Sequence, residues 1–185
     1  MQNYHEFLDE ILISEDDIQK RIRELGEQIS HDYQGQELIL VCILRGGVLF
    51  LTDLMRHITV PHTLEFMAVS SYGVGARQSS GQPRINLDVN TDIRNRNVLI
   101  IEDIVDSGHT IRAVLDFLGT RQPKSLRVCT LIDKANRRET PVPVDYLGFS
   151  IPDKFVFGYG LDIDEYYRNL PFIGTVNTQK YHPGE

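Results

Sequence analysis

The sequence predicts one α/β domain with a mostly parallel sheet flanked by helices. Unbroken apolar runs occupy residues 38–44 and 98–101, which is typical of strands covered on both faces, and residues 125–132 predict a further strand. Helical patterns alternate with these runs, which favours βαβ units. The 185 residues suit a single domain spanning 1–185 with a sizeable core.

Composition excludes several classes of function. A net charge of −7 argues against a nucleic-acid partner, because such proteins neutralise phosphates with excess basic residues. No apolar run reaches membrane-spanning length and the N-terminal stretch is polar and acidic, so we expect a cytoplasmic protein without a membrane partner. Cys42 and Cys129 both lie in apolar strand-like runs and are expected to be reduced core residues.

The N-terminal part predicts a short strand or extended arm over residues 9–13, followed by a helix. Ser14 with Asp17 three residues later is a helix-capping pattern. Apolar residues then recur at helical spacing to about residue 33, and Gly35 ends the helix. We expect this apolar stripe to serve packing alone.

The next strand, residues 37–44, ends in a turn made of Arg45, Gly46 and Gly47. The carboxyl edge of an open α/β sheet is where ligands bind, and Arg45 adds a positive charge there. The turn lacks both the dinucleotide-binding glycine spacing and the Lys-Ser/Thr pair of a nucleotide-triphosphate loop. The residues alone leave open whether it binds an anion or is a tight turn with a solvated arginine.

A third strand over residues 64–69 leads into a long polar stretch. Ser71 and Tyr72 open it, and it continues to about residue 91 with several Gly and Pro residues. A loop of this length inside a compact domain is either disordered or a functional lid.

The richest segment is residues 98–110. Its apolar strand is followed by two carboxylates, Glu102 and Asp103, and then by small polar residues that lead into a helix. Free backbone N–H groups and the positive end of the helix dipole make such a turn an anion site. The residues of this turn are Asp106, Ser107, Gly108, His109 and Thr110.

A phosphate at that turn would be repelled by Glu102 and Asp103 unless Mg²⁺ or sugar hydroxyls intervened. The segment therefore suggests a phosphorylated sugar with a metal nearby. The alternatives are an ordinary strand–turn–helix with solvated acids, and a role for Asp106 as a helix N-cap only.

Two later strands are expected over residues 125–132 and 144–149. Lys134 follows the first, where it could hydrogen-bond a carbonyl or lie at the surface. Residues 151–162 fit a strand with aromatic core residues, or a base pocket in which Phe155 stacks on a flat ring and Val156 offers backbone groups.

Residues 98–110 resemble the phosphoribosyl pyrophosphate signature of type I phosphoribosyltransferases at every defining position: an apolar strand, two acids, two apolar residues, then Asp-Ser/Thr-Gly-x-Thr. Residues 151–162 are similar to the hypoxanthine–guanine branch of that family. The resemblance spans about residues 5–171. It implies a type I phosphoribosyltransferase fold, with a small hood built from the N- and C-terminal segments and a lid loop over about residues 73–91.

The resemblance implies transfer of a phosphoribosyl group from phosphoribosyl pyrophosphate to hypoxanthine, and to guanine as well, giving IMP or GMP and pyrophosphate. It assigns the 5′-phosphate to residues 106–110 and makes Asp106 the general base. Mg²⁺ would be held near Glu102, Asp103 and Asp162. The pyrophosphate would be bound by Arg45, Gly46 and Arg168, with a cis peptide between Leu44 and Arg45.

In the same family the purine is bound by residues that match Lys134, which contacts O6, and Phe155, Val156 and Asp162. Ser71 and Tyr72 match the Ser-Tyr pair of the lid, which closes over the reaction. Relatives form dimers and tetramers, so the resemblance also implies a homodimer or homotetramer.

Two alternatives remain. One is a xanthine-preferring enzyme of the same fold; Lys134 with Phe155 and Val156 argues against pyrimidine and adenine. The other is a regulator that keeps the fold and binds RNA or DNA, which the acidic balance and the lack of an added DNA-binding segment disfavour. Residues 172–185 carry no readable signal.

Overall fold

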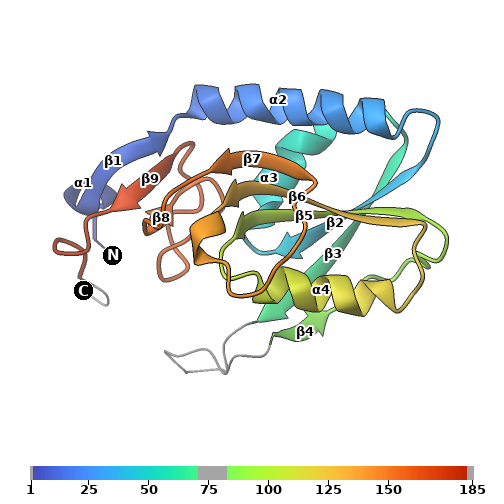
Figure 1. The fold of residues 1–185 in the computed structure, drawn as a ribbon. Helices are drawn as coiled ribbons and strands as arrows, with labels where there is room; N and C mark the ends of the chain where they lie inside the picture. The colour runs from blue at the N-terminus through green and yellow to red at the C-terminus, as the bar shows by residue number, and fades with distance from the viewer. Residues whose placement is uncertain (1, 71–82, 183–185) are drawn as a thin grey trace.

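The computed structural model describes residues 2–70 and 83–182, and its centre is a six-stranded sheet (Figure 1). The strand order is β4-β3-β2-β5-β6-β7; β4 is antiparallel to β3, and the other neighbouring pairs are parallel. The bounds are β2 Leu38–Leu44, β3 His62–Ser70, β4 Arg84–Leu87, β5 Asn97–Val105, β6 Ser125–Asp133 and β7 Tyr146–Ser150.

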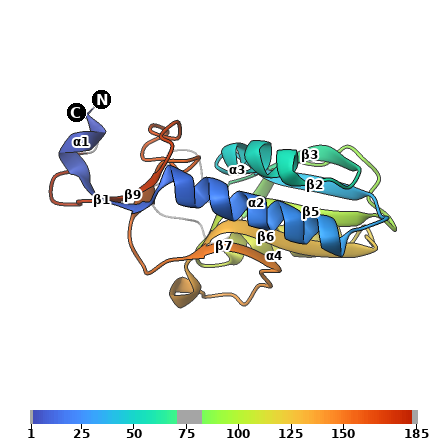
Figure 2. The same cartoon turned by 90° about the horizontal axis from the view of Figure 1, so that it is seen from above.

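Helices cover both faces of this sheet (Figures 1 and 2). α2 (Glu15–Asp32) and α3 (Gly47–Leu54) lie on one face and α4 (His109–Gly119) on the other. Along β2, Leu38, Leu40 and Cys42 join the core under α2 and α3, whereas Ile39, Val41 and Ile43 join the core under α4. Because alternate side chains of a strand point to opposite faces, burial on both faces explains the unbroken apolar run.

A second, antiparallel sheet forms a hood from the two ends of the chain. Its order is β1-β9-β8, with β1 Leu8–Ile13, β8 Val156–Phe157 and β9 Ile173–Val176. Phe7, at the end of the short helix α1 (Tyr4–Phe7), packs with Phe157 in a small separate core. The hood implied by the family resemblance is confirmed. Strand β9 lies within residues 172–185, where the sequence did not predict a helix or a strand.

The sheet order places a topological switch between β2 and β5. From β2 the chain continues through α3 to β3 on one side, whereas β5 continues through α4 to β6 on the other. Ligands of open α/β sheets bind at such a point, outside the carboxyl ends of the strands. The turn after β2 and the turn after β5 therefore face the same crevice.

Two expectations about element bounds were wrong. β5 does not end at residue 101: it continues to Val105 because β6 runs alongside and pairs Glu102 with Thr130 and Val105 with Asp133. The expected lid loop is not a loop at residues 84–87, because β4 pairs there with β3 and Ile85 packs against the core under α4. Ser71, Tyr72 and the rest of residues 71–82 lie outside the described part of the chain.

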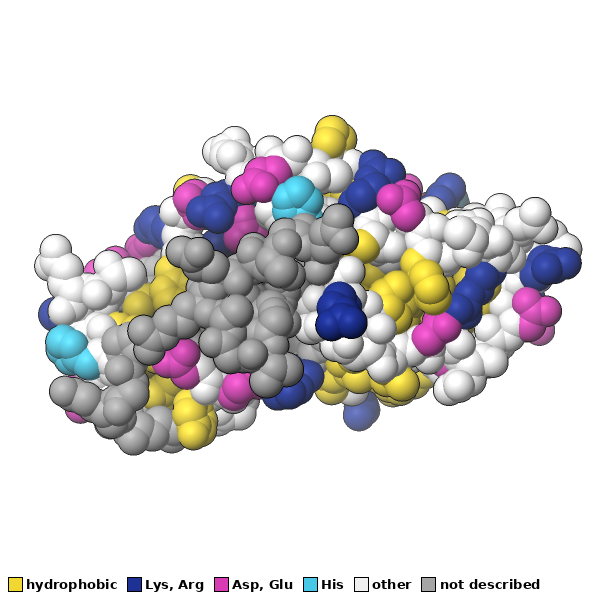
Figure 3. Space-filling view, turned by 90° about the horizontal axis from the view of Figure 1, so that it is seen from below, with side chains coloured by type: hydrophobic (Ala, Val, Ile, Leu, Met, Phe, Trp, Pro, Cys, Tyr) yellow, Lys and Arg dark blue, Asp and Glu magenta, His cyan; other side chains and the backbone are white. Residues whose placement is uncertain are grey.

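The remaining elements are short 3₁₀ turns at Met55–His57 and Ala135–Arg137. Among residues 2–70 and 83–182, none of the helices is long and apolar enough to cross a membrane. In Figure 3, acidic and basic side chains lie interspersed over the described part of the visible surface.

Candidate active site

The turn after β2 and the acids of β5 touch directly. Gly46 lies against Asp103, so closely that a Cβ atom on this glycine would overlap Oδ2 of the carboxylate. Gly47 is similarly close to the backbone of β5, since its Cβ would lie 3.2 Å from the carbonyl oxygen of Ile101. The peptide between Leu44 and Arg45 is cis, as the family resemblance implied.

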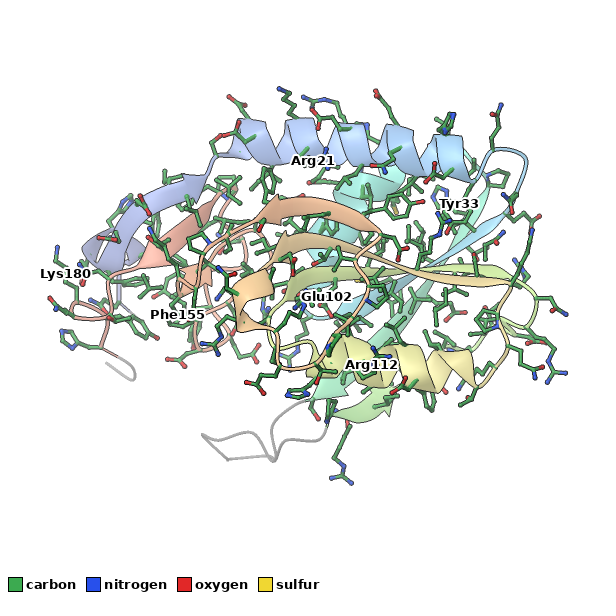
Figure 4. All side chains as sticks on the ribbon, in the orientation of Figure 1. Arg21, Tyr33, Glu102, Arg112, Phe155 and Lys180 are labelled. Atoms are coloured by element: carbon green, nitrogen blue, oxygen red, sulfur yellow. The ribbon has the colours of Figure 1, made fainter. Side chains whose placement is uncertain are left out.

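Glu102 and Asp103 differ sharply in environment. Glu102 is 6% exposed, and its burial raises the pKa of its carboxyl well above the usual range, with the neighbouring Asp103 charge raising it further. Asp103 accepts a hydrogen bond at Oδ1 from the backbone N–H of Ile104 (2.9 Å). Figure 4 shows Glu102 near the middle of the molecule, and it lies within β5, three residues before the strand ends at Val105.

These two carboxylates suit Mg²⁺ as part of a shared coordination shell. Within the described chain, no three or more His, Cys, Asp or Glu side chains converge to hold a metal ion by themselves, so Asp162 does not join this pair in a ready-made cage. Mg²⁺ is commonly bound through one or two carboxylates together with substrate phosphates and waters. A pair of acids beside an anion-binding turn fits that pattern.

The turn after β5 leads directly into a helix N-terminus, as the sequence predicted. α4 begins at His109, and its N-cap is Gly108, with φ of +90° and no side-chain capping bond. The left-handed conformation suits glycine alone here, because a Cβ would also overlap the carbonyl oxygen of Thr140. Asp106 is therefore not the helix N-cap, and that alternative for its role was wrong.

A loop that sequence reasoning missed braces this turn from the side. After β6, the backbone N–H groups of Glu139 and Thr140 both donate to the carbonyl oxygen of Ser107, each over 3.0 Å. Arg138 donates to the backbone oxygen of Asp106 (2.5 Å), and Nε of Arg137 donates to Oδ1 of Asp106 (3.1 Å). The polar run after Lys134 is the sequence feature that could have indicated this brace. Its role can be recognised only from the contact that it makes with residues 106–110.

His109 is also fixed by that loop. Its Nε2 lies 2.8 Å from the Glu139 carboxylate and its Nδ1 lies 3.0 Å from the Thr140 hydroxyl. Both nitrogens of the imidazole therefore contact the bracing loop. The backbone N–H groups at the N-terminus of α4 point along the helix axis, away from the body of the helix.

The expected purine-binding residues lie next to this turn. Lys134 is 7% exposed at the carboxyl end of β6, with Nζ 4.0 Å from Oδ1 of Asp153. Arg137 bridges Asp153 (3.3 Å) and Asp106, so Asp106 and Lys134 are joined through Arg137 and Asp153 together. Sequence reasoning did not assign a role to Arg137 or Asp153.

Phe155 and Val156 have opposite environments. The Phe155 ring is 50% exposed and lies toward the hood in Figure 4, available to stack on a flat ligand. Val156 is buried, pairs with Thr175 in the hood sheet, and keeps its backbone in β8. Its side chain is thus a core residue, and only its backbone could contact a base.

The last part of the site is the loop that follows β8. The Cβ of a side chain at Gly160 would overlap the carbonyl oxygen of Gly46, so this loop lies directly on the turn after β2. Arg168 donates to the carbonyl oxygen of Gly160 (2.7 Å) and pairs with Asp162 (2.8 Å). Arg45, from the turn after β2, reaches the same loop and pairs with Glu165 (2.5 Å).

The contacts thus bring the predicted site residues together in two groups. One holds Glu102, Asp103 and the turns around Gly46 and Gly160, and the other holds the anion-binding turn, Lys134 and Phe155. Ser71 and Tyr72, the expected lid residues, fall within the residues that the structure leaves undescribed.

Comparison with known proteins gives the same picture. The sequence model of the Phosphoribosyl transferase domain matches residues 11–164. Hypoxanthine phosphoribosyltransferase of Salmonella typhimurium is 50% identical over 169 residues, covering 90% of this chain and 94% of its own. Hypoxanthine-guanine phosphoribosyltransferase of Mycobacterium bovis is 51% identical over 177 residues, covering 92% and 87%.

Solved structures extend the match to three dimensions. A crystal structure of a hypoxanthine phosphoribosyltransferase from Staphylococcus aureus superposes with a TM-score of 0.90 at 45% identity, covering 97% of both chains. A hypoxanthine-guanine phosphoribosyltransferase from Bacillus anthracis superposes with a TM-score of 0.85 at 39% identity, covering 92% of this chain and 98% of its own. With the family model matched over most of its length, this chain belongs to the phosphoribosyltransferase family.

Proposed function

We propose that this enzyme transfers the 5-phosphoribosyl group of phosphoribosyl pyrophosphate to hypoxanthine, giving IMP and pyrophosphate in purine salvage. The observation that carries the proposal is the joining of Asp106, in the anion-binding turn, to Lys134, in the base pocket, through Arg137 and Asp153. The printed names of the relatives in Salmonella and Staphylococcus support hypoxanthine as the acceptor.

The 5′-phosphate of the substrate is assigned to residues 106–110. Gly108 turns the chain into α4, so that backbone N–H groups and the helix dipole face the phosphate. The hydroxyls of Ser107 and Thr110 add donors. The brace from residues 137–140 holds this turn in place before the substrate arrives, which reduces the cost of ordering it on binding.

The pyrophosphate is assigned to the other side of Glu102 and Asp103. Arg45, the backbone at Gly46 and Arg168 supply positive charge and donors there, which stabilises the negative charge that develops as pyrophosphate departs. Mg²⁺, when bound with the substrate near Glu102, Asp103 and Asp162, would neutralise part of that charge.

Asp106 is assigned the general base. One carboxylate oxygen accepts from Arg137, and the other remains for a proton from N7 of the purine. As that proton moves to Asp106, N9 becomes electron-rich and forms its bond to C1′ of the ribose, while the bond from C1′ to the pyrophosphate oxygen breaks. The bond electrons leave with the pyrophosphate, so the charges balance.

The purine is assigned to the region between the carboxyl end of β6, where Lys134 lies, and β8 of the hood, which follows Phe155. Lys134 donates to O6, Phe155 stacks on the ring, and the backbone at Val156 and the carboxylate of Asp162 face the ring edge that carries C2. A guanine amino group would meet this edge. We also propose that residues 1–185 form one phosphoribosyltransferase domain with Ser71 and Tyr72 in a lid, and that the enzyme works in the cytoplasm as a homodimer or homotetramer.

Steady-state kinetics with hypoxanthine, guanine and xanthine, each with and without Mg²⁺, tests this function. We expect IMP formation from hypoxanthine that requires Mg²⁺, and the guanine rate shows whether the second base is also a substrate. A preference for xanthine would support the alternative enzyme, and a folded, Mg²⁺-supplied sample that makes no nucleotide from any purine would overturn the proposal.

A further inference from the structure

The two arginines assigned to pyrophosphate share one protein carboxylate. Oε2 of Glu165 lies 2.5 Å from Nη1 of Arg45 and 3.1 Å from Nη2 of Arg168. Arg45 and Glu165 are 120 positions apart in sequence, so the contact joins the turn after β2 to the loop after β8. One oxygen atom thus receives both guanidinium groups.

The Glu165 oxygen accepts from the same two guanidinium groups that are assigned to a pyrophosphate oxygen. Guanidinium groups bind carboxylate and phosphate oxygens with the same donors and the same geometry. Arg45 and Arg168 can therefore donate the same hydrogen bonds to a negatively charged oxygen whether that oxygen belongs to Glu165 or to pyrophosphate.

The surroundings of Glu165 hold its backbone and leave its carboxylate able to move. The backbone N–H of Glu165 donates to Oδ2 of Asp162 (2.9 Å), which anchors the residue in its loop. The Glu165 side chain is 61% exposed and that of Arg45 is 71% exposed. Since water can solvate this carboxylate once it leaves the arginines, its displacement costs little.

Arg168 is held independently of Glu165. It donates to the carbonyl oxygen of Gly160 (2.7 Å) and pairs with Asp162 (2.8 Å), and its side chain is 26% exposed. Losing the Glu165 contact would therefore leave Arg168 in position, with one of its donors free.

We propose that Glu165 is an internal competitor of pyrophosphate: in the free enzyme its carboxylate occupies the space between Arg45 and Arg168 that the pyrophosphate takes in the complex. The inference rests on the proposed function, which assigns pyrophosphate to these arginines. Each molecule of phosphoribosyl pyrophosphate that binds displaces the Glu165 carboxylate from the two arginines. The carboxylate returns to them as the pyrophosphate product leaves. Glu165 thereby weakens the hold on the product and favours its release.

The variant Glu165→Gln tests this directly, because it removes the charge and keeps the size of the side chain. Isothermal titration calorimetry of the full chain with pyrophosphate, at fixed Mg²⁺, gives Kd. Exposed ion pairs contribute modestly, so we expect pyrophosphate to bind roughly three- to tenfold more tightly to this variant. The KM for phosphoribosyl pyrophosphate should decrease as well.

Asp164→Asn is the matched control. Asp164 is the adjacent residue and carries the same charge, but its carboxylate accepts from the Tyr181 hydroxyl (2.6 Å). If the contact with the arginines is what matters, this variant should bind pyrophosphate within about twofold of the unaltered enzyme, because long-range charge effects are screened by salt.

Three outcomes would overturn the inference. Unchanged affinity in Glu165→Gln would show that the carboxylate does not compete. Weaker affinity would show that Glu165 instead holds the arginines in place. An equal gain in pyrophosphate affinity in Asp164→Asn would show that the effect comes from the change in net charge alone. If the unaltered enzyme makes IMP in the same preparation, each of these results rejects the inference and leaves the proposed function standing.

Discussion

The carboxylate of Asp103 fills the space that a side chain on Gly46 would need. This contact joins the turn after β2 to the acids of β5 at the switch point of the sheet, with no atom between them. Gly46 has φ of −62°, a conformation open to any residue, so the requirement for glycine at this position comes from Asp103 rather than from the backbone.

Gly46→Ala should therefore damage catalysis more than folding. The added methyl group must push the Asp103 carboxylate or the turn aside, and displacements of about 1 Å in a catalytic site can cost on the order of 100-fold in rate. We expect kcat/KM for phosphoribosyl pyrophosphate to fall by roughly that factor. Gly119→Ala is the control, because nothing lies within 4 Å of its Cβ position at the end of α4; equal losses in both variants would contradict this account.

Asp106→Asn should cut kcat by roughly 10²- to 10⁴-fold while the affinity for phosphoribosyl pyrophosphate stays near normal. The amide keeps the shape of the side chain and an oxygen that can accept from Arg137, and the contacts of the brace with the backbone oxygens of Asp106 and Ser107 are unaffected. Steady-state kinetics and a direct binding measurement separate the two effects. Near-normal turnover would remove Asp106 as the base.

Lys134→Ala should mainly weaken binding of the purine. A hydrogen bond from a charged group contributes about 1.5–3 kcal/mol, so the KM for hypoxanthine should rise roughly ten- to a hundredfold. Lys124→Ala serves as the control, since Lys124 is exposed and donates to Gln36 (2.9 Å) at the opposite end of the strands. An unchanged hypoxanthine affinity in Lys134→Ala would place the lysine outside the base pocket.

Glu102 predicts a distinct dependence of stability on pH. Its pKa in the folded protein is raised well above 4.5, so between that value and the folded pKa the folded state binds more protons than the unfolded chain. The free energy of unfolding of the metal-free protein should therefore decrease as pH rises through this window, by at most about 1.4 kcal/mol per pH unit from this group.

Glu102→Gln removes the group that titrates and should flatten that part of the profile. Urea unfolding of both proteins from pH 5 to 8, with chelator present, measures the difference. Identical slopes for the two proteins would show that Glu102 is not the group responsible.

Much of the fold follows from patterns within single segments. Ser14 caps α2 as expected, its hydroxyl accepting from the N–H of Asp17 (3.2 Å), and the apolar runs form the buried strands of a parallel sheet. The motif at residues 98–110 also forms a strand, a turn and a helix in the expected order, although its strand continues beyond the expected end at residue 101.

The features that sequence reasoning missed depend on residues far apart in the chain. The extension of β5 to Val105 requires β6 beside it, and β4 forms because β3 offers an edge. The brace by Arg137 and the pairing of Arg45 with Glu165 are contacts between loops. Charged residues in polar runs are usually solvated, so no local pattern marks these as part of a site.

The most direct test of the account is a crystal structure of this protein with phosphoribosyl pyrophosphate and Mg²⁺. We predict the 5′-phosphate against the backbone of residues 107–110 and the pyrophosphate between Arg45 and Arg168. A well-ordered ligand bound away from the crevice between β2 and β5 would contradict it.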